Sequence, residues 1–153
     1  MWRLKSAAAR RLLLLSTLLA APTAANSANL VLITPEEARL PPEHAPIMLA
    51  QRGVTRAPSI DVVLPPDASH SPFHLQMKFQ AHGGARIDPT SVQATYLRLP
   101  NVDLTQRIKP YLTEGGIDVP AAEVPPGEHA VRVDVSDSEG HRASTSFVLK
   151  IGP

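Results

Sequence analysis

The stretch HAVRVDVSDSEGHRASTSFVLKI, residues 129–151, decides the fold. In its first half valines alternate with polar residues, and in its second half a phenylalanine and a leucine share one face. A period of two is typical of a β-strand that buries one face. The stretch therefore predicts two adjacent antiparallel strands, joined by a turn at residues 138–140, with five apolar side chains facing the core. These are Val131, Val133, Val135, Phe147 and Leu149.

The same alternation occurs upstream and is clearest over residues 73–80, where every second side chain is large and apolar: Phe73, Leu75, Met77 and Phe79. Further short strands are expected over residues 60–64, 92–99 and 117–119, and a weaker one over 103–109. After residue 45 no convincing helical pattern occurs, and the connections are too short for the crossovers that parallel strands need. The sequence predicts an all-β fold, an antiparallel β-sandwich of six to seven strands, with a small barrel as the alternative.

The first 28 residues have the order of a secretory signal peptide. A basic start precedes the run 12–21, which gives way to Pro22 and small residues. Ten residues cover only ~15 Å as a helix, about half of a hydrocarbon core, so a spanning helix is not expected. Cleavage is expected after Ala25 or Ala28, and the absence of cysteine excludes a lipid-attached N-terminus. We therefore expect a periplasmic or secreted protein, whose leader holds the bases Arg3, Lys5, Arg10 and Arg11.

Residues 29–58 form a proline-rich stretch ahead of the expected domain, residues 59–153. Prolines at this density remove ladder donors and interrupt helices, so the stretch is expected to be a loose, extended lead-in. Within it, residues 30–33 could pair as an edge strand, and residues 35–39 could form one helical turn before Pro41 ends it.

The charge of the mature chain differs from that of the whole. Without the four bases of the leader, 11 basic residues face 14 acidic ones, a net charge of −3. Such a chain has no basic stripe for nucleic acid and no basic amphipathic helix for a membrane surface. It also has no cysteine, so its hydrophobic core has to stabilise it without disulfides, which is feasible for a mature chain of ~125 residues.

Two segments together resemble a bacterial immunoglobulin-like domain, a β-sandwich of the Big or fibronectin III-like kind found in exported proteins. The first is IDPTSV at residues 87–92, followed by NVDLT at 101–105; the second is PPGEHAVRV at 125–133, leading to DSEGH at 137–141. The resemblance covers residues 58–151 and implies an immunoglobulin-like fold. Such domains serve adhesion, ligand binding or spacing, so the resemblance implies no particular activity.

The histidines are the first candidates for a metal site. His70 and His74 are four positions apart, but in extended chain this spans ~13 Å, too far to share one ion. We expect surface histidines. The turn at residues 136–141 is also similar to one in secreted copper carriers with an immunoglobulin-like sandwich, which implies a copper site at His141. Those carriers use an N-terminal histidine too, whereas here the first histidine is His44.

Acidic residues near the last turn offer a second possibility. Asp134, Asp137 and Glu139 could supply oxygens to calcium, although a single Asp-x-Glu beside a glycine is more typical of turn chemistry. The chain has no Gly-x-Ser-x-Gly nucleophile elbow and no glycine-rich phosphate loop.

No residue is therefore assigned a catalytic, cofactor-binding or metal-binding role. We expect a non-enzymatic, exported immunoglobulin-like domain that binds or extends another envelope or secreted protein. Nucleic acid and stable membrane insertion after signal cleavage are not expected. The alternative is a small periplasmic copper-binding protein that uses His141 and nearby acids.

Overall fold

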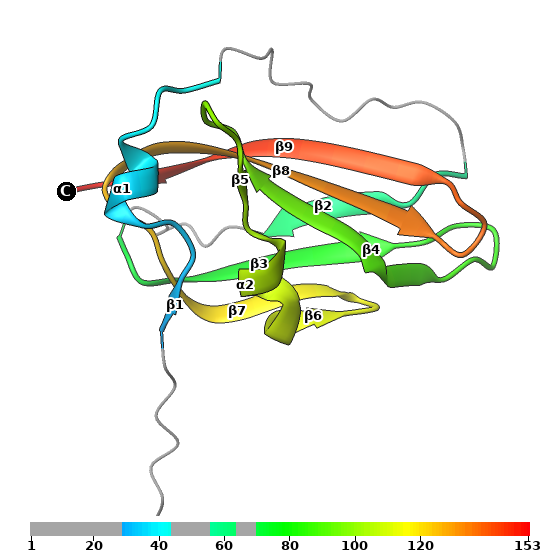
Figure 1. The fold of residues 1–153 in the computed structure, drawn as a ribbon. Helices are drawn as coiled ribbons and strands as arrows, with labels where there is room; N and C mark the ends of the chain where they lie inside the picture. The colour runs from blue at the N-terminus through cyan, green and yellow to red at the C-terminus, as the bar shows by residue number, and fades with distance from the viewer. Residues whose placement is uncertain (1–28, 44–55, 64–69) are drawn as a thin grey trace, which may run out of the picture.

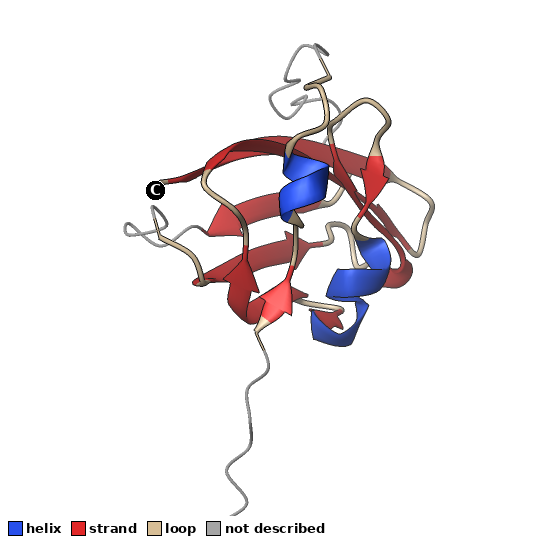
Figure 2. Cartoon of the chain, turned by 60° about the vertical axis from the view of Figure 1, so that its left-hand side comes forward, coloured by secondary structure: helices blue, strands red, loops and turns tan. Residues whose placement is uncertain are grey.

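The computed structural model describes residues 29–43, 56–63 and 70–153, and the predicted signal peptide lies outside these ranges. The described residues form nine strands, two short α-helices and one 3-10 helix. The strands lie in two sheets, as Figures 1 and 2 show. The buried side chains of both sheets form one core. This confirms the all-β prediction. The strands outnumber the expected six or seven because three have only two residues: β1 (Leu30–Val31), β5 (Val102–Asp103) and β6 (Leu112–Thr113).

The first sheet has the order β1-β7-β3-β2, with β6 also paired to β7. Its longer strands are β2 (Ser59–Val63), β3 (Phe73–Gln80) and β7 (Gly116–Glu123). All its pairings are antiparallel except that of β1, which runs parallel to β7.

The second sheet has the order β5-β4-β8-β9 and is antiparallel throughout. Its longer strands are β4 (Ile87–Tyr96), β8 (Gly127–Asp137) and β9 (Arg142–Ile151). Among the described strands, the chain passes between the sheets three times: from β3 to β4, back from β5 to β6, and again from β7 to β8. Strands distant in the sequence therefore become neighbours.

The inward faces follow the period of two. The side chains at alternate positions of β3 are at most 7% exposed, and the three valines of β8 are at most 3% exposed. β8 and β9 pair in one continuous register from Gly127↔Ile151 to Ser136↔Arg142, as expected for the hairpin. Leu149 is buried, and Phe147 is partly buried against the core.

The backbone conformation of the hairpin turn explains why glycine occupies position 140. The amide of Gly140 donates to Asp137 O (3.0 Å), and the amide of Asp137 donates to His141 O (3.0 Å). Gly140 has a φ of +83°, so the turn has the pattern of a type I turn followed by a left-handed residue. This conformation favours glycine because it lacks a Cβ atom.

The strand predicted over residues 103–109 is wrong, and so is the expectation of no helix after residue 45. β5 ends at Asp103, and α2 (Thr105–Ile108) and the 3-10 helix η1 (Lys109–Tyr111) follow. The carboxylate of Asp103 accepts the amide of Thr105 at 2.8 Å, which favours a helix start. Leu104 and Ile108, four positions apart, are both buried, so helical spacing places them on one inward face.

Residues 29–43, here called the N-terminal segment, pack against the two sheets. Leu32 and Ile33 are 2% and 1% exposed and belong to the core. The predicted edge strand and helical turn are both present, as β1 and α1 (Pro35–Ala38). Thr34 caps α1 in a capping box with Glu37, which satisfies amides that a helix start otherwise leaves unbonded.

Candidate functional site

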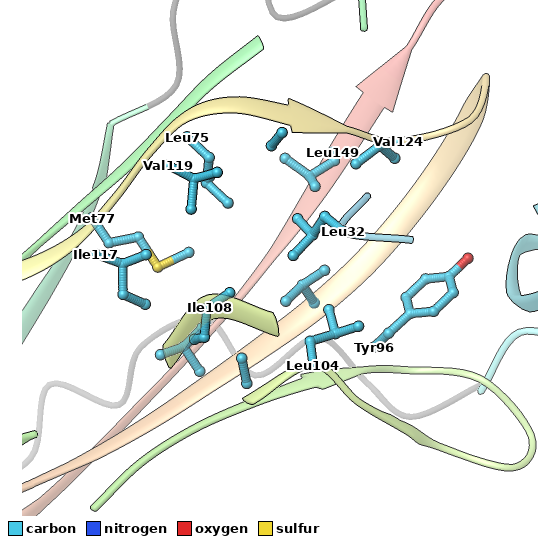
Figure 3. Packing of buried hydrophobic residues seen from close by; sticks show 14 of the residues in the cluster. Leu32, Leu75, Met77, Tyr96, Leu104, Ile108, Ile117, Val119, Val124 and Leu149 are labelled. Carbon is cyan, nitrogen blue, oxygen red and sulfur yellow. The ribbon is translucent and has the colours of Figure 1, made fainter. Parts of the chain in front are cut away.

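The main polar cluster of the described residues surrounds His129. This residue was expected at the surface, but it is only 1% exposed, so that prediction is wrong. His129 lies near the start of β8 on the same face as Val131, since both occupy odd-numbered positions of one strand. Beside it, Tyr96 ends β4 and is fully buried, and Figure 3 shows its hydroxyl directed away from the labelled aliphatic side chains.

The hydrogen bonds of His129 determine which ring nitrogen carries the proton. Its Nε2 lies 2.8 Å from Pro125 O, and its Nδ1 lies 2.8 Å from the hydroxyl oxygen of Tyr96. Because a carbonyl oxygen only accepts, Nε2 must donate to Pro125. In the neutral ring Nδ1 is then an acceptor, and the hydroxyl of Tyr96 donates to it.

Arg98 completes the cluster from the loop after β4. Its Nε donates to the hydroxyl of Tyr96 at 2.6 Å, and its two terminal nitrogens donate to Leu40 O and Glu128 O, both at 3.1 Å. Its guanidinium carbon lies 5.0 Å from the centre of the Tyr96 ring. The guanidinium of Arg98 thus links the N-terminal segment to the end of β4 and the start of β8.

Burial governs the acid–base chemistry of this cluster. Burial lowers the pKa of His129, and the nearby positive charge of Arg98 acts in the same direction, against the bond to Pro125 O. Burial raises the pKa of Tyr96, partly offset by the bond from Arg98. Both rings are therefore held in their neutral forms.

The turn that carries His141 is a second polar cluster. The amides of Glu139 and His141 both donate to Asp137 Oδ1 at 2.9 Å, and Nδ1 of His141 lies 3.0 Å from Asp137 Oδ2. Burial acts to raise the pKa of Asp137, but these bonds from His141 and Glu139 hold it below its usual value. The carboxylate of Asp137 therefore organises the turn, as turn chemistry predicts.

This geometry bears on the copper and calcium hypotheses. Glu139 Oε2 lies 3.7 Å from Nδ1 of His141, so one imidazole and two carboxylates meet at the turn. Both oxygens of Asp137 already have partners in the turn. Within residues 29–43, 56–63 and 70–153, no three His, Asp or Glu side chains are arranged to hold a metal ion.

His74, the other candidate histidine, lies on the first sheet. Its Nε2 is 2.6 Å from Asp118 Oδ1 across β3 and β7, and both side chains are more than half exposed. Exposed pairs of this kind contribute about 0–1 kcal/mol to stability. His70 is also exposed, as expected.

A small cavity lies in the core of the described residues. Its volume is about 10 Å³, and apolar side chains line it, including Leu75, Leu104 and Phe147. Ligand pockets typically measure ~300 Å³ or more, so this space does not hold a substrate.

No helix in the described part of the chain has the length and apolar character to cross a membrane.

Comparison with known proteins identifies no relative: no family model, no curated protein and no solved structure matches this chain.

Proposed function

We propose that this chain is a non-enzymatic, exported immunoglobulin-like domain that binds another protein of the bacterial cell envelope. The strand connectivity supports the immunoglobulin-like part of the proposal. β2, β3 and β7 correspond to strands A, B and E of such sandwiches, and β4, β8 and β9 to strands C, F and G. β5 then occupies the place of a short strand beside C.

The bond from His129 to Pro125 gives further support. In immunoglobulin-type sandwiches, a tyrosine near the start of strand F commonly bonds to backbone a few residues upstream. Here a histidine at the start of β8 bonds to the carbonyl four residues earlier. The site of the contact is the same although the side chain differs.

The observation that carries the binding proposal is the edge formed by β9. Among the strands that the structure describes, β9 pairs only with β8, and its ten residues contain no proline and no bulge. An edge strand with unpaired backbone groups is a template for a strand from another chain.

The register of the hairpin defines which groups of β9 are free to pair. The residues Asp137 and His141 face each other as a bonded pair, and bonded and non-bonded pairs alternate along an antiparallel ladder. Odd-numbered residues of β9, such as Thr145, therefore bond to β8. The even-numbered residues direct their amides and carbonyls outward: Arg142, Ser144, Ser146, Val148 and Lys150.

A photo-crosslinking residue at the exposed position Ser144 tests this proposal in the native envelope. We expect a discrete crosslinked product with one envelope protein, and none from the same probe at the exposed Gln80 of the other sheet. Adding Ser146→Pro removes an outward amide and should abolish the product, whereas Ser146→Ala should preserve it. Equal crosslinking from both probe positions, or none at Ser144, contradicts binding along β9; the second outcome favours a spacer role.

Copper binding at His141 is the second candidate, supported by its contacts with Asp137 and Glu139. Copper(II) at about 100-fold its dissociation constant should stabilise a binding protein by ~2.7 kcal/mol. A melting temperature that rises with copper, and does not rise in His141→Ala, would favour the carrier.

A further inference from the structure

The cluster around His129 is compatible with only one protonation state of its ring. Nε2 donates to Pro125 O, so the bond to Tyr96 requires an unprotonated Nδ1. Arg98 already occupies the hydroxyl oxygen of Tyr96 as a donor. The hydroxyl proton of Tyr96 must therefore go to Nδ1.

We propose that His129, Tyr96 and Arg98 form a proton-sensitive latch that holds the N-terminal segment on the second sheet at neutral pH and loosens it at mildly acidic pH. Neutral His129 accepts the hydroxyl of Tyr96, which in turn orients Arg98 toward Leu40 O. Among these three side chains, Arg98 is the one that hydrogen-bonds to both the sheet and the N-terminal segment, through Glu128 O and Leu40 O.

Protonation removes the acceptor at the centre of this chain of bonds. A proton on Nδ1 makes His129 a donor at both nitrogens, so the hydroxyl of Tyr96 faces two donors and its own proton loses its partner. A buried group that loses its hydrogen bond destabilises the folded state. The protonated ring also places a second positive charge close to Arg98. We expect this charge to weaken the bond from Arg98 to Leu40 O.

Backbone bonds close to Arg98 hold the end of the N-terminal segment. The amide of Leu99 donates to Pro41 O at 2.9 Å, and the amide of Glu43 donates to Leu97 O at 3.4 Å. Both bonds lie within two residues of Arg98. Their protection against exchange with solvent therefore reports directly on the latch.

Of the other charges on the elements around His129, that of Glu43 is the exception to pairing, because its Oε2 is buried without a hydrogen-bond partner in the described part of the chain. Glu128, the preceding residue on β8, lies 3.0 Å from Lys150 on β9, and Glu37 of α1 pairs with Arg107 at 2.6 Å. Leu149, opposite His129 on β9, carries no charge. Among the described residues, no carboxylate bonds to the ring of His129 to stabilise its protonated form.

The direction of the pH effect follows from these surroundings. Burial lowers the pKa of His129 below its ordinary value of 6.5. Above that ordinary value the neutral latch is fully present, because neither the folded nor the unfolded chain binds the proton. As the pH falls below it, the unfolded chain takes up the proton first, and the folded state loses stability.

Amide hydrogen exchange on the purified protein at about pH 7.5 and about pH 5 tests the latch. On going to acidic pH, we expect the protection factors of Leu99 and Glu43 to fall about tenfold more in the wild type than in His129→Gln. Glutamine retains an N–H donor for Pro125 but does not titrate. His70→Gln, which removes an exposed histidine, should behave as the wild type does.

A second measurement needs no variant and decides the matter where His129→Gln does not fold. In an NMR titration of the wild type, the ring of His129 should titrate below the ordinary histidine value of 6.5. The proposal is overturned if the ring of His129 titrates at or above that value, or if His129→Gln loses protection at Leu99 and Glu43 as much as the wild type does.

Discussion

At the scale of single residues, Gly116 has the least freedom to change. It has a φ of +142°, and a Cβ atom at this position would lie 1.9 Å from the carbonyl oxygen of Met77 on the neighbouring strand. Since that neighbour is backbone, it cannot rotate away. Gly116→Ala should therefore destabilise the protein by several kcal/mol, about 3 or more, or prevent folding.

The adjacent glycine provides the control. A Cβ atom on Gly115 would meet only the side-chain oxygen of Thr113, at 3.8 Å, an ordinary contact distance. Urea unfolding of Gly115→Ala should give a free energy within about 1 kcal/mol of the wild type. Similar losses for both alanine variants would contradict the close approach of β7 to β3.

At the scale of elements, the ion pair between α1 and α2 links parts of the chain 70 positions apart. Two nitrogens of Arg107 donate to the two carboxylate oxygens of Glu37 at 2.8 and 2.6 Å, and one also donates to Leu32 O. The bond from Arg107 lowers the pKa of Glu37 to about 2, despite the opposing effect of burial. A bidentate pair of this kind fixes the relative orientation of the two side chains and also attracts them to each other.

Removing Arg107 should therefore weaken the attachment of the N-terminal segment in a pH-dependent way. At neutral pH, Arg107→Ala should cost about 1–3 kcal/mol in urea unfolding. Because the folded pKa of Glu37 lies below its ordinary 4.5, the contribution of the pair is present above 4.5 and is lost as the pH falls toward 2. Wild type and variant should converge at acidic pH; Glu36→Gln, an exposed change in the same helix, should stay within about 0.5 kcal/mol of the wild type at neutral pH.

These elements also show what the sequence could predict. Alternation correctly assigned the inward faces of β3 and β8, because a period of two needs only local residues. The same rule, extended by one step from Val131, places His129 inward, although its polar ring suggested the surface. The helix α2 has only four residues, too few to show a period of their own. The contact of Arg107 with Glu37 depends on folding across the whole chain, so neither local sequence marks it.

At the scale of the whole molecule, the expected cleavage sites of the signal peptide lie directly before the first described residue of the fold. Cleavage after Ala25 or Ala28 leaves Asn29, whose side chain donates to Glu123 at 2.6 Å, and leaves β1 intact. Mass spectrometry of the exported protein should find a chain that begins within residues 26–29. A soluble cytoplasmic chain that retains Met1 would contradict the export proposal.

A shorter mature chain should not be stable, because Leu32 and Ile33 fill the core between the sheets. A variant that begins at Pro35 loses both side chains, each worth about 1.5–3 kcal/mol, and also the pairing of β1 with β7. The loss of about 3–6 kcal/mol is comparable to the net stability of many domains, so we expect partial or complete unfolding at room temperature. A variant that begins at Asn29 should melt as the mature protein does. Equal melting temperatures for the two variants would show that the N-terminal segment is dispensable and that the two sheets form a stable unit without it.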